Sequence, residues 1–354
     1  MEHIPVMLNE AIKYLNIKKD GVYIDCTFGS GGHSLEIIKN LSSDGKLFVL
    51  DLDYETEKLF IEKFGVCSSA QPDNSPNIET SCRVAGESCQ TDMSGGSPRY
   101  EADCRVDETC QTGMPDGSPC CLSDDMVVKN AKFICSNFAE LPTVVKKYNI
   151  KKIDGVLFDF GFSSLQIGNH SRGFSFNFEA PLDMRYNKNN SLTADKIVNT
   201  YEEKELVKIF SDFGDEQFAP KIARAISIHR MQKKISTTLE LVEIIRCATP
   251  HWYHKRKIHF ATKAFQALRI AVNGELENIE KGVLLAINLV SSTARIITIS
   301  FHSIEHRLLK NIFKEAVKNN FVKLIEKKPV FPQQLEKLKN PRSRSAQMRI
   351  VEKI

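Results

Sequence analysis

Residues 22–33 read VYIDCTFGSGGH, and this stretch decides the fold. Its first four residues form a β-rich run, its glycines follow as a turn, and a helical pattern then begins in which Leu35, Ile38 and Leu41 share a face. Because glycine has no Cβ, the turn lets the backbone approach a ligand closely. The spacing differs from G-x-G-x-x-G, which leaves a dinucleotide fold poorly supported, and no Gly-Lys-Ser/Thr follows, which excludes a P-loop. A tight strand-to-helix turn without a ligand is the alternative.

Strands and helices alternate outward from this turn. We expect a helix over residues 55–64 and further strands over residues 46–51, 133–135, 153–159 and 296–300. This alternation predicts an α/β fold with a mostly parallel, doubly wound sheet, whose ligands lie beyond the carboxyl ends of the strands. Asp51 ends the second strand, where an acidic side chain is placed to bind a ribose diol. S-adenosylmethionine, a cofactor with a ribose and no phosphate, fits these features.

The composition is that of a globular protein. The chain has 354 residues, of which 42% are hydrophobic and 26% charged, which suggests about two domains. No apolar run approaches the roughly 20 residues of a membrane span, and the N-terminus shows no secretory pattern. We therefore expect a cytoplasmic protein without a membrane segment.

Residues 67–124 differ from the rest of the sequence. They hold ten acidic but only three basic side chains and seven of the ten cysteines, and residues 82–98 nearly recur as residues 104–119. Zinc binding is weakly supported by this cysteine spacing without a histidine, and disulfides need an oxidising compartment. We expect a tolerated, mostly disordered insertion. The remaining cysteines stand among apolar residues and are expected to be buried: Cys26, Cys135 and Cys247.

From about residue 192 the pattern becomes helical. Two capping boxes, at residues 200–203 and 237–240, predict helix starts, and residues 265–279 predict a longer amphipathic helix that returns to the sheet. Residues 217–269 hold eleven basic but only two acidic side chains and include the single tryptophan, Trp252. This combination suits phosphate contact and base stacking, although a solvated basic face is the alternative. The RNA-binding candidates are Lys255, Arg256, Lys257 and Arg269.

A metal site in this region is weakly supported. Three histidines lie close together in the sequence, His251, His254 and His259, but no nearby Cys, Asp or Glu completes a set of ligands. We expect no metal.

Eight ordered strings are more specific than any of these patterns. They are HIPVML at 3–8, DCTFGSGGHS at 25–34, DFGFSS at 159–164, RGFSF at 172–176, PLDMR at 181–185, FQALRIAVN at 265–273, SFHS at 300–303 and NPRSRSA at 340–346. The sequence resembles the MraW/RsmH family, bacterial methyltransferases that use S-adenosylmethionine to methylate N4 of a cytidine in 16S ribosomal RNA. The resemblance covers nearly the whole chain apart from residues 67–124.

The resemblance implies a domain organisation, a cofactor and a partner. A Rossmann-like class I methyltransferase domain is implied over residues 1–168 and 273–354, interrupted by the insertion at 67–124 and by a helical RNA-recognition domain at 169–272. The implied cofactor is S-adenosyl-L-methionine, and the partner is 16S rRNA or the small ribosomal subunit. The implied cofactor contacts are Gly31, Gly32 and His33 at the methionine end, Asp51 at the ribose, Phe138 at the adenine, and Asp159 and Gln166 after the fourth strand.

Methyl transfer to an exocyclic amine is an in-line displacement. The site must align N4 with the methyl group and accept hydrogen bonds from the amino group. Asp159 and residues 160–164 stand where other aminomethyltransferases carry Asp/Asn-Pro-Pro-aromatic, but this loop lacks both prolines. We therefore take Asp159 or nearby main-chain carbonyls as the acceptor. Asp183 and Arg185 are second candidates, for which a structural ion pair is equally open.

A base buried in an RNA helix cannot reach such a site, so a single-stranded or flipped-out base is expected. Methylation at C5 would need a cysteine nucleophile, and the Pro119-Cys120 pair lies in the insertion. An adenine-N6 or other nucleic-acid aminomethyltransferase stays open, as does a catalytically silent rRNA-binding assembly factor. The oligomeric state also stays open. Four phenylalanines are candidates either for stacking on the base or for the core: Phe162, Phe174, Phe176 and Phe178.

Overall fold

The computed structural model describes residues 4–53, 55–64, 127–128, 130–161 and 170–354. The insertion at residues 67–124 and the predicted cofactor contact Gln166 therefore lie outside the described residues. Among the helices that the structure describes, none combines the length and apolar character needed to span a bilayer.

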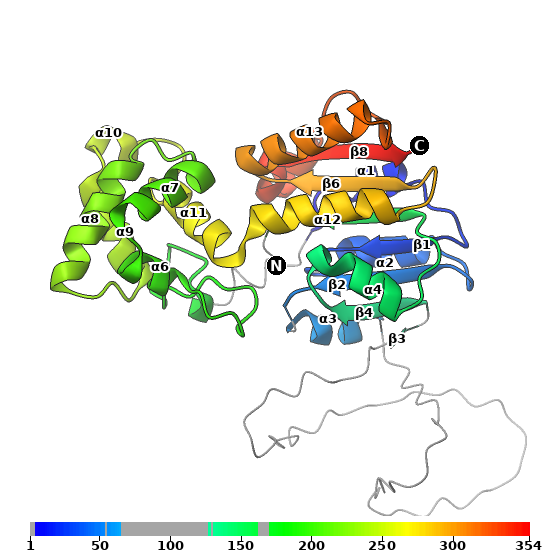
Figure 1. Cartoon of the computed structure of the whole chain (residues 1–354), viewed down its shortest axis with the longest axis horizontal. Coiled ribbons are helices and arrows are strands. Elements are labelled where there is room, and N and C mark those ends of the chain that lie inside the picture. Colours follow the sequence, from blue (N-terminus) through cyan, green and yellow to red (C-terminus); the bar gives the residue numbers. More distant parts are fainter. Residues whose placement is uncertain (1–3, 54, 65–126, 129, 162–169) are drawn as a thin grey trace, which may run out of the picture. The chain divides into compact units, whose positions relative to one another are not determined.

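Eight strands of the described chain form one mixed sheet in the order β3-β4-β2-β1-β5-β6-β8-β7 (Figure 1). The central strands pair in parallel, whereas β3, β7 and β8 pair antiparallel to their neighbours. The predicted α/β fold with a mostly parallel sheet is therefore confirmed. The strands are β1 (Val22–Asp25), β2 (Lys46–Asp51), β3 (Val127–Val128), β4 (Ala131–Cys135), β5 (Gly155–Asp159), β6 (Arg295–Ser300), β7 (Val322–Leu324) and β8 (Gln347–Lys353).

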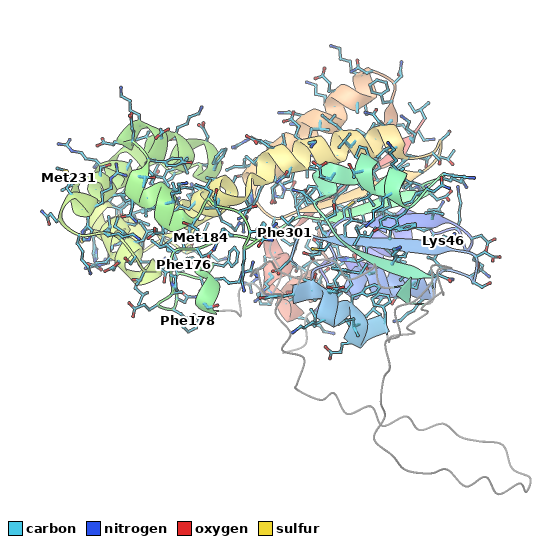
Figure 2. The ribbon with its side chains drawn as sticks, turned by 60° about the horizontal axis from the view of Figure 1, so that its bottom comes forward. Lys46, Phe176, Phe178, Met184, Met231 and Phe301 are labelled. Carbon is cyan, nitrogen blue, oxygen red and sulfur yellow. The ribbon has the colours of Figure 1, made fainter. Side chains whose placement is uncertain are left out.

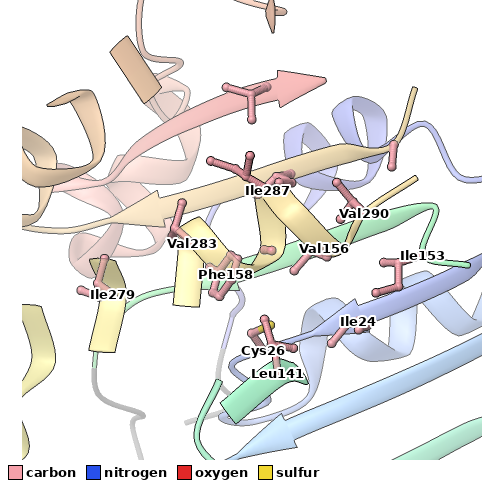
Figure 3. Packing of buried hydrophobic residues seen from close by; sticks show 14 of the residues in the cluster. Ile24, Cys26, Leu141, Ile153, Val156, Phe158, Ile279, Val283, Ile287 and Val290 are labelled. Carbon is pink, nitrogen blue, oxygen red and sulfur yellow. The ribbon is translucent and has the colours of Figure 1, made fainter. Parts of the chain in front are cut away.

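Helices cover both faces of this sheet. One face packs against α1 (Leu8–Leu15), α2 (Gly32–Lys39) and α3 (Glu55–Phe64), and the other against α4 (Leu141–Lys147), α12 (Glu275–Leu289) and α13 (Ser303–Lys318). Figure 3 shows Ile279, Val283 and Ile287 of α12 close to Phe158 of β5. Full burial of each such side chain contributes about 1.5–3 kcal/mol, so these contacts hold the helices on the sheet.

A run of helices stands in the chain between β5 and α12. Their apolar faces form a hydrophobic cluster separate from the two clusters of the sheet, with Phe210, Ile222 and Leu241 among its fully buried members. The helices are α6 (Ala194–Thr200), α7 (Glu203–Gly214), α8 (Ala219–Gln232), α9 (Thr238–Ala248), α10 (His251–His254) and α11 (Thr262–Asn273). Short elements complete the described chain: η1 (Phe138–Glu140), η2 (His170–Arg172), α14 (Gln334–Lys339) and η3 (Pro341–Ser345).

One of the two predicted capping boxes is confirmed. Thr237 and Glu240 exchange hydrogen bonds between side chain and backbone at the start of α9. The box at residues 200–203 is wrong, because Thr200 is still the last residue of α6 and its hydroxyl donates to the Lys196 carbonyl. The next helix is capped at Glu202, whose N–H donates to the side chain of Glu205 over 2.8 Å.

Two further expectations need correction. The single helix predicted over residues 265–279 is divided into α11 and α12 by Gly274, which has a φ of +59° and so ends α11 in the left-handed region. Cys26 is buried as expected, but Cys135 and Cys247 are exposed. Cys135 is the last residue of β4 and Cys247 lies in the last turn of α9, so apolar neighbours in sequence do not cover them.

Candidate active site

The site lies where the strand order reverses. Strand β1 stands between β2 and β5, and the chain winds away from it in both directions, so the loops after β1 and β5 leave a crevice at their carboxyl ends. A cavity of about 460 Å³ lies at this edge. Residues that follow β1, β2, β4, β5 and β6 line it, together with residues of α11 and α12.

The glycine-rich turn after β1 is shaped by close packing. Gly31 has a φ of +78°, and a Cβ at this position would lie 2.7 Å from the Phe28 ring. A Cβ at Gly32 would lie 2.3 Å from Cγ of Pro5. Larger residues are therefore excluded at both positions, and the turn places Gly32 and His33 in the cavity wall.

Asp51 ends β2 and lines the cavity. Its Oδ2 accepts a hydrogen bond from the N–H of Gly29 and its Oδ1 one from the N–H of Asp53, each over 2.8 Å. Burial raises the pKa of this carboxyl to about 7, although the two N–H donors oppose the shift. The carboxylate ties the glycine-rich turn to the loop after β2, and each of its oxygens keeps a further lone pair for a ligand hydroxyl.

Asp159 ends β5 and lies across the crevice. Its Oδ1 is buried and has no hydrogen-bond partner among the described residues. Burial raises the pKa of this carboxyl well above its ordinary value, and the charges of Asp25 and Glu305 raise it further. Asp159 therefore holds a proton more readily than an exposed aspartate, and its buried oxygen is suited to a cationic or hydrogen-donating ligand.

His33 faces Asp159 from the first turn of α2. Its Nε2 lies 3.0 Å from the carbonyl oxygen of Val6, and its Nδ1 lies 3.6 Å from Oδ2 of Asp159. A carbonyl only accepts hydrogen bonds, so Nε2 carries a hydrogen. The contact between Nδ1 and Oδ2 is attractive only when one of these atoms also carries a proton. The structure thus places the His33 ring beside the Asp159 carboxyl group.

Phe138 lines the cavity from the η1 turn after β4. Its ring centroid lies 5.7 Å from that of Phe158 and 5.8 Å from that of Phe160, with both pairs edge-to-face. Gly282 of α12 makes room for this ring, because a Cβ there would lie 2.5 Å from it. The sheet and α12 thus hold the Phe138 ring between them, and this ring forms an aromatic part of the cavity wall.

Further aromatic rings line the cavity from distant segments. Phe176 stacks on His259 with centroids 4.7 Å apart, and Phe174 stacks on Tyr186 at 5.6 Å. Figure 2 labels Phe176 in this wall and Phe301, which follows β6. The other two stacking candidates differ: Phe178 is 51% exposed and does not line the cavity, and Phe162 lies outside the described residues.

The sequence did not reveal the buried polar cluster beside these rings. Arg269 donates two hydrogen bonds to the carboxylate of Glu275, at 2.9 and 3.0 Å, and the Tyr186 hydroxyl donates to the same carboxylate over 2.9 Å. His302 Nε2 lies 3.1 Å from Oε1 of Glu305. The atoms of Glu275, His302 and Glu305 that could ligate a metal ion lie within 4.8 Å of one another. We assign no metal there, since Arg269 already balances the Glu275 charge.

One signal for this cluster was present in the sequence. His302 and Glu305 follow the strand expected at residues 296–300, and residues at the carboxyl ends of parallel strands are those that meet ligands. No comparable signal pairs Arg269 with Glu275, because the two side chains meet only where α11 turns into α12.

The structure brings together some predicted site residues and separates others. Gly32, His33, Asp51, Phe138, Asp159 and Arg269 all line the cavity. Asp183 instead forms a two-pronged ion pair with Arg185, with both N···O distances 2.8 Å, and within the described chain this pair is not part of the cavity wall. Lys255, Arg256 and Lys257 are exposed after α10 and also lie outside that wall.

Comparison with known proteins gives the family. The model of the MraW methylase family matches residues 1–64 and 122–354. "Ribosomal RNA small subunit methyltransferase H" of Malacoplasma penetrans (strain HF-2) is 37% identical, and the match covers 100% of this chain and 97% of that protein. The protein of the same name from Clostridium botulinum (strain Kyoto / Type A2) is also 37% identical, with 100% and 99% covered.

Solved structures give a weaker likeness. An rRNA methylase from Streptococcus thermophilus has a TM-score of 0.39 and 7% identity, and the match covers 100% of this chain and 99% of that one. The family match spans more than half of the sequence and both curated relatives cover its whole length. This chain therefore belongs to the MraW methylase family.

Proposed function

We propose that this chain transfers a methyl group from S-adenosylmethionine to N4 of a cytidine in 16S rRNA, at the decoding centre of the small ribosomal subunit. Its membership of a methylase family and the name of its relatives, ribosomal RNA small subunit methyltransferase H, support rRNA of the small subunit as the substrate. The observation that carries the chemistry is the buried Oδ1 of Asp159 in an aromatic-lined cavity, which has no hydrogen-bond partner among the residues that the structure describes.

The residues around the cavity fit the cofactor. Gly32 and His33 would hold its methionine end, Asp51 its ribose hydroxyls and Phe138 its adenine, while Gly31 shapes the turn. A buried carboxylate oxygen without a partner is costly unless a donor or a positive charge meets it, and this cofactor brings a positive charge. When bound, S-adenosylmethionine supplies the electrophilic methyl group. Asp159 and Gln166 complete the proposed contacts.

The chain's own residues position the base and take up the proton. Phe174, Phe176 and Phe301 offer ring surfaces on which a flipped-out base stacks. The amino group of cytosine donates a hydrogen bond to Asp159, which aligns the N4 lone pair. N4 must lose a proton once the methyl group is attached, and the raised pKa of Asp159 makes its ionised carboxylate a stronger base for this proton than an exposed aspartate would be. Exposed Lys255, Arg256 and Lys257 contact the phosphates of the same RNA.

Nucleoside mass spectrometry of 16S rRNA tests this proposal. Cells that lack the gene are complemented with the wild type, with Asp159→Asn, or with the exposed-site control Asp44→Asn. We expect N4-methylated cytidine to be missing without the gene, to return with wild type and control, and to stay missing with Asp159→Asn. Loss of N6-methyladenosine instead would favour the adenine alternative, and an unchanged pattern would favour the silent assembly factor.

The purified proteins give a second measurement. Because Asp159 is proposed both to orient the amino group and to accept its proton, Asp159→Asn should lower kcat by a factor of about 100 or more. A kcat within a factor of about two of the Asp44→Asn control would overturn the assigned role.

A further inference from the structure

The short turn η3 places a basic side chain at the wall of the cavity. Arg342 and Ser345 both line the cavity, and both are exposed, as is Arg344 between them. The turn precedes β8 and belongs to the sheet part of the chain, far in sequence from the basic stretch at residues 217–269. The cavity wall thus carries a cationic element that the proposed chemistry of methyl transfer does not use.

This turn is held in place by hydrogen bonds. The carbonyl oxygen of Asn340 accepts from the N–H and from the hydroxyl of Ser343, over 3.0 and 2.8 Å. The amide of Asn340 donates to the Ile4 carbonyl over 3.0 Å, and the N–H of Met7 donates to Glu336 over 2.8 Å. Val6, between these anchors, carries the carbonyl that holds His33. The backbone of the turn is therefore fixed beside the glycine-rich turn before any ligand binds, which lowers the entropic cost of binding.

The sequence that leads into the turn is strongly basic. Residues 327–344 contain a single acidic side chain, Glu336, which is occupied by the N–H of Met7 and whose pKa is raised by burial. The same residues contain six basic side chains: Lys327, Lys328, Lys337, Lys339, Arg342 and Arg344. Such a surface attracts a polyanion.

We propose that the turn Pro341–Ser345 binds the phosphate backbone of the RNA strand that carries the target nucleotide. This inference rests on the proposed function and adds a contact surface on the sheet part of the chain. A base inserted into the cavity leaves its neighbouring phosphates at the rim, where Arg342 and Ser345 stand. One guanidinium group can donate two parallel hydrogen bonds to the oxygens of one phosphate, and a serine hydroxyl can donate to the same oxygens.

RNA binding as a function of salt tests this contact. The variant Arg342→Ala/Arg344→Ala is compared with Lys310→Ala/Lys314→Ala, which removes two exposed charges of α13 that are not in the cavity wall. The probe is a single-stranded oligonucleotide of the decoding-centre sequence, followed by fluorescence anisotropy. We expect the arginine variant to bind it at least about tenfold more weakly, with a log–log salt slope smaller by about 1.4, because each phosphate contact on a single strand contributes about 0.7.

Calorimetry with S-adenosylhomocysteine shows whether the two arginines contact the RNA, as proposed, or the cofactor. We expect the affinity for S-adenosylhomocysteine to equal that of the wild type in both variants. The inference is overturned if the arginine variant matches the lysine control in affinity and slope, or if it weakens S-adenosylhomocysteine rather than RNA. If the wild type fails to methylate rRNA but the arginine variant still weakens RNA binding, the proposed function falls and the contact surface stands.

Discussion

At the scale of the residue, burial determines what the site carboxylates do. Asp51 has a pKa of about 7 because it is buried, and its two N–H donors only partly compensate. An ionised carboxylate accepts hydrogen bonds from ribose hydroxyls with both oxygens, whereas a protonated carboxyl group has fewer acceptor sites. We therefore expect the affinity for S-adenosylhomocysteine to rise as the pH increases through about 7 and then to level off.

Calorimetry from about pH 6 to pH 8 measures this dependence. Asp51→Asn should bind more weakly and lose the rise that is centred near pH 7, and Asp44→Asn should keep it. An unchanged rise in Asp51→Asn would assign the titration to another group, such as Asp159. The same raised pKa means that Asp51 binds more protons in the ligand-free folded state than in the unfolded chain between about pH 4 and 7, so the contribution of this one group to stability falls as the pH rises across that range.

Some site residues could be predicted from the sequence, and others could not. Asp51 was predicted as a site residue because it ends a strand, and Asp159 because the family resemblance implies it; the structure places both in the cavity wall. Asp183 pairs with Arg185 and does not line the cavity, and this outcome depends on side-chain directions that a sequence does not contain.

At the scale of the element, α12 shapes the cavity through a glycine. A Cβ at Gly282 would lie 2.5 Å from the Phe138 ring, so Gly282→Ala should displace that ring and weaken S-adenosylhomocysteine binding by about tenfold. Alanine favours a helix interior over glycine by about 1 kcal/mol, which offsets part of the packing cost and keeps the variant folded. Isothermal titration measures the affinity.

The matched control is Gly274→Ala between α11 and α12. A Cβ there would meet only the Asn278 amide at 3.7 Å, but the residue would keep a φ of +59°, which costs about 1–2 kcal/mol. It should therefore lower the free energy of unfolding without changing the affinity. Equal affinities in both variants would show that Phe138 does not contact the cofactor.

Helix boundaries were predictable where the deciding groups are neighbours in the chain. The box at Thr237 and Glu240 is such a case, since its two residues are three apart. The division at Gly274 was missed because residues 265–279 keep one apolar periodicity through it. The antiparallel strands β7 and β8 were also missed, because pairing with a distant strand stabilises them more than their own sequence. Strand β3 was missed because it is only two residues long and pairs with the neighbouring β4.

At the scale of the whole molecule, a buried ion pair joins segments that are distant in sequence. Nη1 of Arg172 lies 2.5 Å from Oδ2 of Asp53, and both side chains are 4% exposed. Its Nη2 donates to the carbonyls of Arg185 and Tyr186, each over 2.7 Å. Arg172→Met leaves the Asp53 carboxylate buried without this partner, so we expect the free energy of unfolding to fall by about 3–5 kcal/mol in urea titrations.

Two further variants check this coupling. Asp53→Asn combined with Arg172→Met removes the uncompensated charge and should recover part of the loss. Arg246→Met breaks the exposed pair with Glu243 and should change the stability by about 0.5 kcal/mol or less. A loss in Arg172→Met no larger than that of Arg246→Met would contradict the prediction.

The insertion provides a second prediction at this scale. Helix α3 ends at Phe64, β3 begins at Val127, and the family model leaves residues 65–121 unmatched. Because loop-closure entropy changes slowly with length, replacing residues 67–124 by a short Gly/Ser linker should change stability by about 1 kcal/mol or less and preserve methylation. Urea unfolding and rRNA methylation assays measure both. A Gly/Ser segment of the original length separates length from sequence, and loss of activity in a folded protein with either linker would contradict dispensability.

The sequence by itself determined the alternation of strands and helices, the glycine-rich turn and the carboxylates at the strand ends. These depend on the period of apolar residues and on the backbone freedom of glycine, both of which act between neighbours in the chain. Only the tertiary structure decided that Arg269 binds Glu275, that Arg172 binds Asp53 and that the turn at Arg342 stands beside the turn at Gly32. Charged side chains from distant segments form ion pairs, and buried carboxyl groups change their pKa, only after folding has removed water and brought these segments together.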